Sequence, residues 1–192
     1  MNNSKKLILF CTILVALAVG SRLLTIEMSW YNFASLGAIA LFSGAMFKNN
    51  KMYALLLPLL AVLASDLIIH FTYGFGFYGV SQYFVYASLL LVVLLGTRMK
   101  RVKAGSVFGY SIIASLLFFF ISNIGTWFAG FFPTAAVPAL YPTNFAGLIA
   151  CIEMGIPFYR NTLISDMLFS GVLFGAYSLY QTLAKQQHTV IA

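Results

Sequence analysis

The chain has 192 residues, of which 61% are hydrophobic and 8% are charged, and its mean hydropathy is +0.94. Because soluble domains carry roughly 25% charged residues, this composition excludes an ordinary soluble protein and predicts an integral membrane protein. The net charge of +7 comes with no stretch long enough to fold as a soluble basic surface, so we expect no nucleic-acid partner.

Six long apolar stretches predict six transmembrane helices. In chain order they cover residues 7–20, 33–47, 52–71, 80–97, 106–128 and 162–183. Most approach the ~20 residues that cross ~30 Å of hydrocarbon, whereas the second is short. The tail at 186–192 is too short to form another domain. We therefore predict an all-α membrane bundle of six helices, with residues 1–192 in one domain and the lipid bilayer around it.

The positions of the cations predict the orientation of the bundle. Lys and Arg in short loops stay on the cytoplasmic side. With the N-terminus inside, the inner side holds nine cations and no acid, namely Lys5, Lys6, Lys48, Lys51, Arg98, Lys100, Arg101, Lys103 and Lys185. The outer side holds Arg22 and Arg160 with the four acids. We therefore predict a multi-pass protein of the bacterial cytoplasmic membrane with both termini in the cytoplasm.

The first apolar stretch allows a second interpretation. Lys5 and Lys6, the apolar run and Ala16-Leu17-Ala18 also fit a cleavable signal peptide. Small residues suited to helix packing favour a retained helix instead. Cys11 and Cys151 lie at different predicted membrane depths, so we expect no disulfide between them.

Small residues follow one another at helical spacing in several of the predicted spans. They predict close helix packing at Gly37, Ala40 and Gly44 in the second span and at Gly171, Gly175 and Ser178 in the sixth. In the fifth span a stripe of Ser111, Ser115, Ser122 and Thr126 predicts a face turned toward protein rather than lipid.

The predicted outer loops are rich in aromatic residues, glycine and proline. They cover residues 21–32, 73–79 with the sequence YGFGFYG, and 130–159, which contains four prolines. About thirty residues is long for a connection between bundle helices, and loops of that length usually have a function.

The stretch LAVLASDLIIHF places a carboxylate inside an apolar helix. Asp66, His70 and Tyr73 follow an i, i+4, i+7 pattern and are predicted to share one helix face. A charge at the centre of a membrane helix costs roughly 2.5–3.5 kcal/mol, so Asp66 needs a partner, which is Arg22 or Arg160. Asp166 has the same need.

The polar side chains gather in the predicted outer half, while the inner half is almost purely apolar. This distribution lacks the continuous polar path of an ion or proton channel and favours a small-molecule pocket open to the outside. Three alternatives stay open: a structural ion pair at Asp66, a hydrogen bond from His70 to Asp66, and an ordinary interfacial aromatic belt. The predicted binding residues are Arg22, Trp30, Asn32, Asp66, His70, Tyr73, Asn123, Trp127, Arg160, Asn161 and Asp166.

Four segments, NFASLGAIALFSGAMF, PLLAVLASDLIIHF, SNIGTWFAG and IPFYRNTLISDMLF, resemble an uncharacterised bacterial family of membrane proteins similar to the substrate-binding S components of energy-coupling factor (ECF) transporters. The resemblance covers most of the chain. It implies capture of a vitamin or other micronutrient at the outer face, followed by reorientation in the membrane. It also implies a coupling subunit and ATPases as partners, docked on a small-residue surface at Ala16 and Gly20, where S components usually carry two alanines.

Two other function classes compete with transport. A membrane scaffold of the rod-shape-determining type has a similar six-helix form and acts through protein partners. An enzyme using Asp66 and His70 as an acid/base pair lacks a Ser or Cys nucleophile beside them, so we expect no catalytic residues. The chain has no Walker A loop, no disulfide framework and no metal-ligand spacing, so we expect neither ATPase activity nor a cofactor or metal.

Overall fold

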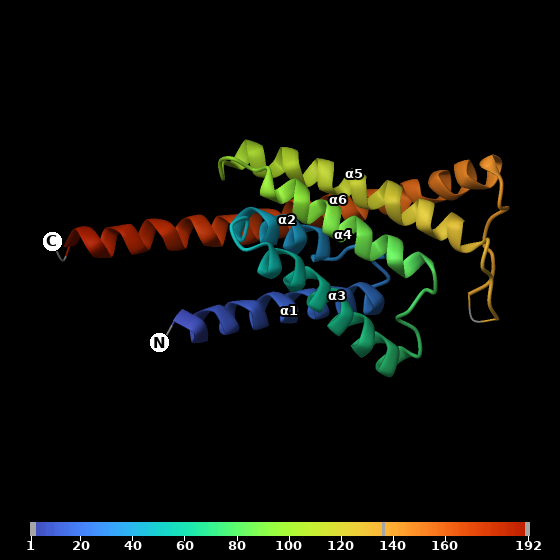
Figure 1. Cartoon of the computed structure of the whole chain (residues 1–192), viewed down its shortest axis with the longest axis horizontal. Helices are drawn as coiled ribbons and strands as arrows, with labels where there is room; N and C mark the ends of the chain where they lie inside the picture. The colour runs from blue at the N-terminus through green and yellow to red at the C-terminus, as the bar shows by residue number, and fades with distance from the viewer. Residues whose placement is uncertain (1–2, 136, 191–192) are drawn as a thin grey trace.

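The computed structural model describes the backbone of residues 3–135 and 137–190, and the side chains of residues 9–135 and 137–183. Within these residues the chain is all-helical (Figure 1). The helices are α1 (Asn3–Glu27), α2 (Leu36–Met46), α3 (Lys51–Tyr73), α4 (Ser81–Thr97), α5 (Ala104–Ala129) and α6 (Phe145–Val190).

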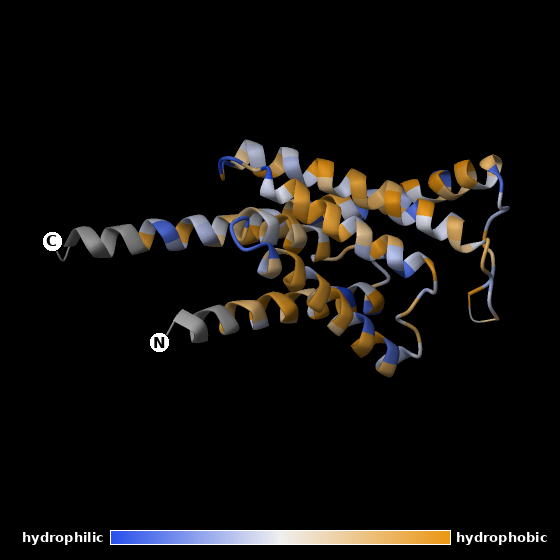
Figure 2. Ribbon diagram, in the orientation of Figure 1, coloured by the Kyte–Doolittle hydropathy of each residue, from blue (hydrophilic) through white to orange (hydrophobic). Residues whose placement is uncertain are grey.

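Four of these helices, α1, α3, α5 and α6, are long and apolar enough to cross a membrane. Apolar residues cover most of their length, with hydrophilic residues at the turns between helices (Figure 2). The other two are shorter: α2 has 11 residues and α4 has 17. At ~1.5 Å per residue, α2 extends only about 17 Å, well short of the ~30 Å hydrocarbon core.

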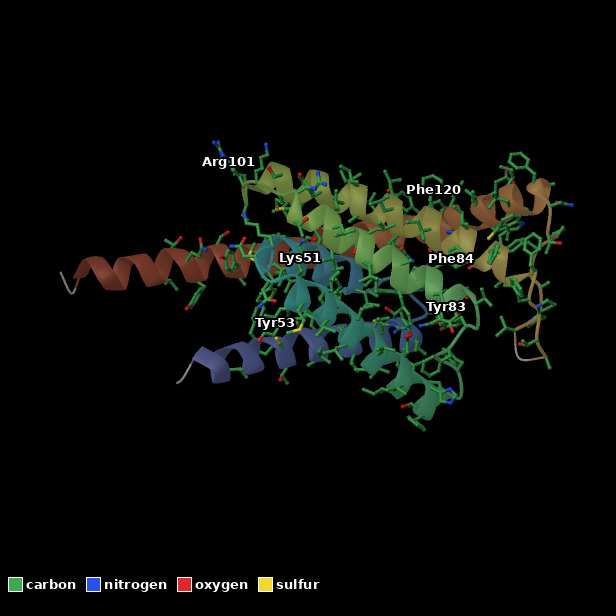
Figure 3. The ribbon with its side chains drawn as sticks, in the orientation of Figure 1. Lys51, Tyr53, Tyr83, Phe84, Arg101 and Phe120 are labelled. Atoms are coloured by element: carbon green, nitrogen blue, oxygen red, sulfur yellow. The ribbon has the colours of Figure 1, made fainter. Side chains whose placement is uncertain are left out.

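The two ends of the bundle differ in charge. The turns at 47–50 and 98–103 lie at the same end as both ends of the chain (Figure 1). Lys51 and Arg101 lie there, and Tyr83 and Phe84 lie toward the opposite end (Figure 3). We call the first the cationic end. We call the other, which carries segments 28–35, 74–80 and 130–144, the loop end. The predicted separation of cations is confirmed for the side chains that the structure describes; those of Lys5, Lys6 and Lys185 lie outside that part.

Helix α2 forms the centre of the bundle. Every residue from Leu36 to Ala45 is buried, and α2 contacts all five other helices. A Cβ on Gly44 would overlap the Val93 carbonyl of α4, and a Cβ on Gly96 would overlap the Leu41 carbonyl of α2. The predicted close packing in the second span is therefore confirmed, and its partner is α4.

The third predicted loop is wrong over its second half. Residues 145–159 belong to α6, which begins at Phe145 rather than at 162. The side chain of Asn144 accepts a hydrogen bond from the Gly147 N–H at 2.9 Å, as an N-cap does. Pro157 lies inside the helix, where the missing hydrogen bond is offset by packing against α5, the helix that α6 contacts most. Pro157, Glu153 and the neighbouring Arg160 gave this stretch the composition of a loop.

Of the three other small-residue faces, the one on α5 is buried or half-buried, and those on α6 and α1 are open. Ser111 and Ser115 are fully buried and Ser122 and Thr126 are half-buried, so the protein-facing stripe of α5 is confirmed at its first two residues. A Cβ on Gly171 or Gly175 would meet nothing within 4 Å, so the predicted helix packing there is wrong for the part of the chain that the structure describes. Gly20 of α1 is equally open, and Ala16 is exposed.

Candidate functional site

A buried ion pair joins α1 to α3 in the loop-end half of the bundle. Asp66 is fully buried, and Arg22 of α1 forms an ion pair with its Oδ1 while donating to Ser65 Oγ at 2.5 Å. Between the two cations that the sequence left open, the structure therefore selects Arg22. The pair is held because α1 continues as a helix to Glu27, two turns beyond its predicted end, which brings Arg22 level with Asp66.

Helix α4 completes the coordination of the same carboxylate. Gln82 Nε2 donates to Asp66 Oδ2 at 2.5 Å, and Tyr86 Oη donates to the same oxygen at 3.3 Å. Gln82 Nε2 also donates to Tyr86 Oη at 3.0 Å. We call these five residues, Arg22, Ser65, Asp66, Gln82 and Tyr86, the Asp66 cluster. The carboxylate thus has three partners, Arg22 on α1 and Gln82 and Tyr86 on α4, as a buried charge requires.

One acceptor in the Asp66 cluster is unused. Gln82 is 6% exposed, and its Oε1 has no hydrogen-bond partner in the part of the chain that the structure describes. A buried polar atom without a partner costs roughly 1–3 kcal/mol. The cluster can therefore accept one further hydrogen bond from a donor that is not part of it.

Segment 74–80 folds back over the loop end of α3, next to this cluster. Gly74 ends α3 with φ 78°, and Gly79 precedes α4 with φ 58°, both in the left-handed region that favours glycine. A Cβ on Gly76 would overlap the Asp66 carbonyl oxygen. Partial burial raises the pKa of the Tyr78 phenol. The nearby Asp66 carboxylate raises this pKa further, whereas the Arg22 guanidinium lowers it. These interactions place the segment close to the ion pair.

The predicted shared face of Asp66, His70 and Tyr73 is wrong. Asp66 faces the interior, whereas His70 is exposed and packs edge-on against Phe71 and Phe77, with ring centroids 5.6 and 5.5 Å away. The expected hydrogen bond from His70 to Asp66 is therefore absent in this structure. Tyr73 Oη instead donates to Glu27 Oε1 at 2.5 Å, which ties the ends of α1 and α3 together.

A second buried carboxylate, Asp166 of α6, lies at the beginning of α2. Its oxygens accept hydrogen bonds from Ser115 Oγ at 2.9 Å and from the Ala38 backbone N–H. A Cβ on Gly37 would overlap the carboxylate, so only glycine allows this approach. The first N–H groups of a helix lack partners and carry a partial positive charge, and here a side chain from another helix satisfies them. We call Asp166, Ser115 and the Ala38 N–H the Asp166 cluster.

Arg160, the second cation that the sequence offered as a partner, pairs with neither Asp66 nor Asp166. Arg160 lies inside α6, is exposed, and makes neither an ion pair nor a hydrogen bond with the described residues. Arg160 and Asp166 lie about a turn and a half apart on α6, so their side chains point in different directions. Asp166 is 2% exposed, and its carboxyl group is met by the helix terminus and Ser115 rather than by a cation.

The segment between α1 and α2 is not helical, yet its backbone groups are paired by side chains. Thr25 Oγ1 donates to the Phe33 carbonyl, Asn161 Nδ2 to the Tyr31 carbonyl at 3.0 Å, and Thr162 Oγ1 to the Asn32 carbonyl at 3.4 Å. Irregular backbone at membrane depth is tolerated when protein groups satisfy it in this way. The predicted site residues Asn32 and Asn161 therefore lie in the same region, but Asn161 bonds Tyr31 and Asn32 is bonded by Thr162 rather than by Asn161.

A serine pair connects the two clusters. Ser21 Oγ and Ser35 Oγ lie 3.0 Å apart, and the Ser35 N–H donates to Ser21 Oγ at 3.2 Å. Ser21 precedes Arg22 of the Asp66 cluster, and Ser35 precedes α2, whose first turn receives Asp166. The beginning of α2 is thus bonded to α1 next to Arg22 and receives Asp166 from α6.

The remaining predicted residues hold loops and helices in place. Trp127 Nε1 donates to the carbonyls of Pro142 and Asn144 at 3.2 and 3.1 Å, which fixes segment 130–144. Asn123 Nδ2 donates to the Phe119 carbonyl within α5, and its side chain fills the space above Gly155 of α6. Trp30 is 54% exposed and contacts only Phe33 among the described rings.

Four polar partners were not among the predicted binding residues: Ser65, Gln82, Tyr86 and Ser115, of which only Ser115 had been predicted to face protein. Gln82 and Tyr86 lie one helical turn apart in a predicted span, which is the signal that was available. Two hollows are described in this structure, and both lie at the cationic end. The predicted pocket open to the outside stays a prediction. Of the polar groups expected to line it, Asp66 and Asp166 are buried, whereas Asn32, His70 and Arg160 are exposed. No group of three metal-ligating side chains occurs among the residues described.

A family model described as a family of unknown function, DUF6580, matches residues 2–188, nearly the whole chain. No curated protein and no solved structure matches the chain.

Proposed function

The chain belongs to the DUF6580 family, and we propose that it is a membrane-embedded binding subunit that captures a vitamin or other micronutrient at the extracytoplasmic face. In this proposal the chain crosses the membrane six times in an arrangement similar to the S components of ECF transporters, and α2, with 11 residues, crosses only together with the segments on either side of it. The cationic end faces the cytoplasm with both termini, and the loop end faces outward.

The observation that carries the proposal is the unused acceptor in the Asp66 cluster. A polar cluster that only stabilised helix packing would be expected to have every buried atom paired. Gln82 Oε1 is left without a donor in a cluster that otherwise satisfies its members. A ligand with an amide, amine or hydroxyl donor would supply the missing bond.

The covering segment supports a site that opens and closes. Segment 74–80 contains three glycines, and its aromatic side chains Phe75, Phe77 and Tyr78 are each more than 40% exposed. A segment with few buried apolar contacts opens at low free-energy cost. We infer that its displacement admits the ligand to the Asp66 cluster, after which the rings close over it.

The open surface of α1 supports the coupling to partners. Ala16 is exposed and Gly20 has open space above it, so a flat small-residue surface is available along α1. Small residues allow close approach of a second helix in membranes. In the proposed mechanism an ECF coupling subunit docks here, and its ATPases supply the energy for reorientation.

The test is ligand-dependent thermal stabilisation of the purified protein across a panel of vitamins and related micronutrients. We expect one compound to raise the unfolding temperature of the wild type. Gln82→Met keeps the length of the side chain and removes its hydrogen bonds, so it should abolish that shift. Ser111→Ala, which removes a hydroxyl bonded only within α5 near the cationic end, should keep it. No response to any compound, or an undiminished response in Gln82→Met, would refute the proposal.

The same α1 surface favours one alternative, a scaffold of the rod-shape-determining type. A scaffold also needs an exposed surface for partner helices, but it has no use for an unpaired acceptor beneath a loop. Crosslinking from a cysteine at Ala16 separates the two functions. A coupling subunit with associated ATPases supports transport, whereas cell-wall or cytoskeletal proteins support the scaffold.

A further inference from the structure

A second polar site lies at the cationic end, far from both carboxylate clusters. A hollow of about 570 Å³ lies between the two turns and α6. Four cations line it: Lys48 from the first turn, and Lys100, Arg101 and Lys103 from the second. Ser178, Gln181 and Thr182 of α6 line the facing wall.

No acid balances these four charges. The chain has four acidic residues in all. Asp66 and Asp166 are buried in the two clusters, Glu27 ends α1 at the loop end, and Glu153 lies in the first third of α6. The single ion pair among the described residues is Arg22 with Asp66. The hollow is therefore a concave surface with four unpaired positive charges, which favours an anion.

An apolar hollow of about 230 Å³ adjoins the cationic one. The two share Val102, Lys103 and Ser178 in their walls. From there the apolar hollow runs between α5 and α6, lined by Val107, Phe108, Gly171, Phe174 and Gly175. Because Gly171 and Gly175 have open space where a Cβ would lie, the groove is shaped by missing side chains.

The two hollows together suit an amphiphile with an anionic head. A charged group bound in the first hollow lies within reach of the lysines and the arginine, which bind phosphate through charge-assisted hydrogen bonds. An acyl chain attached to it would enter the glycine-lined groove between apolar helices. Basic hollows at the ends of membrane helices recognise lipid head groups by this combination. A free anion would use the first hollow and leave the groove unused.

We propose that this site binds one anionic phospholipid, with its phosphate in the cationic hollow and one acyl chain in the groove along Gly171 and Gly175. The site is separate from the proposed micronutrient site and does not depend on it. The bound lipid covers the small-residue face of α6 that no described helix covers. Because the lipid head group stays at a membrane surface, binding it would also hold the cationic end of the bundle at that surface.

The test is equilibrium binding of lipids to the full-length, delipidated protein, measured by native mass spectrometry. The probes are phosphatidylglycerol and phosphatidylcholine with identical acyl chains, and glycerol phosphate as the head group without chains. We expect phosphatidylglycerol to bind as a single adduct and at least tenfold more tightly than phosphatidylcholine. Glycerol phosphate should compete poorly.

Two matched pairs of variants locate the site. Lys100→Gln with Arg101→Gln should weaken phosphatidylglycerol binding about 25-fold, since each cation near a membrane surface contributes about fivefold. Lys51→Gln, at the same end but outside the hollow, should change it less than twofold. Gly175→Leu should fill the groove and weaken binding, whereas Gly109→Leu, equally open but outside the groove, should not.

Three results would overturn the proposal. Equal affinity for the two phospholipids, or equal losses in Lys51→Gln and the double variant, would show that the hollow does not select an anionic head group. Competition by glycerol phosphate as strong as that of the whole lipid would show a free-anion site without an acyl chain. Undiminished binding in Gly175→Leu, with the protein folded by circular dichroism, would exclude the groove.

Discussion

The Arg22–Asp66 ion pair makes a sharp prediction about stability. Replacing either residue alone by leucine leaves its partner charged and buried, and removing one member of a buried pair costs about 3–5 kcal/mol. The side chain of Asp66 is 1% exposed and that of Arg22 is 15% exposed, so neither charge can be solvated without opening the helices. We expect Arg22→Leu and Asp66→Leu each to lower the free energy of unfolding by about that amount.

The double variant should lose much less free energy of unfolding than the sum of the losses of the two single variants. With both charges gone, Gln82 Nε2 keeps its bond to Tyr86 Oη at 3.0 Å, and Ser65 Oγ keeps its bond to the Val62 carbonyl at 2.8 Å. The remaining cost is that of a lost acceptor, roughly 1–3 kcal/mol. We therefore expect the double variant to lose at most about 3 kcal/mol, against the ~6–10 kcal/mol of additive single effects.

The assay is reversible unfolding in mixed micelles, with the denaturing detergent titrated and helix content followed by circular dichroism. Ser111→Ala serves as the control for a change in a helix interior far from the pair. If the free-energy losses of the two single variants add in the double variant, then Arg22 and Asp66 are not each other's partner, and the described cluster is wrong.

Three further predictions concern helix packing and loops. Gly44→Ala should destabilise the bundle by about 1–3 kcal/mol in the same titration, because the added methyl overlaps the backbone of α4, whereas Gly109→Ala should be neutral or stabilising, since its Cβ meets nothing within 4 Å. Asp166→Ala should cost about 1–2 kcal/mol by the same unfolding titration, because the first turn of α2 loses its partner; a neutral effect would contradict the cross-helix cap. Trp127→Phe should leave unfolding within about 1 kcal/mol but raise amide exchange, followed by mass spectrometry, in segment 130–144, and unchanged exchange would show that the indole bonds do not hold it.

The membrane character and the separation of charge were predictable because both depend on composition along the chain. Long apolar runs and short cationic turns are local features, and the structure confirms both. The beginning of α6 was not predictable, because a stretch that contains Pro157 and Arg160 has the composition of a loop. Only its packing against α5 shows that it is helical. The second span was predicted to be short, but the start of α2 was not predictable, since its first turn depends on Asp166, which is more than a hundred residues away in the sequence.

The site was predictable as a set of costly charges but not as a set of pairs. A buried carboxylate needs a partner, so Asp66 and Asp166 stood out from composition alone. Which partner each carboxylate binds depends on helix rotation and depth. Asp166 has no cation as its partner and instead accepts hydrogen bonds from Ser115 and from the first turn of α2. The hydrogen bond considered between His70 and Asp66 does not form, because Arg22 and Gln82 already bind the two oxygens of Asp66.

The central claim, that the loop end binds a small molecule beside Gln82, is tested most directly by identifying what co-purifies with the protein. The protein would be released gently from its own membrane and its non-lipid adducts measured by native mass spectrometry. The account predicts one small-molecule adduct on the wild type and on Ser111→Ala, and none on Gln82→Met. A wild type that carries no such adduct even after incubation with the micronutrient panel, or an adduct retained by Gln82→Met, would contradict it.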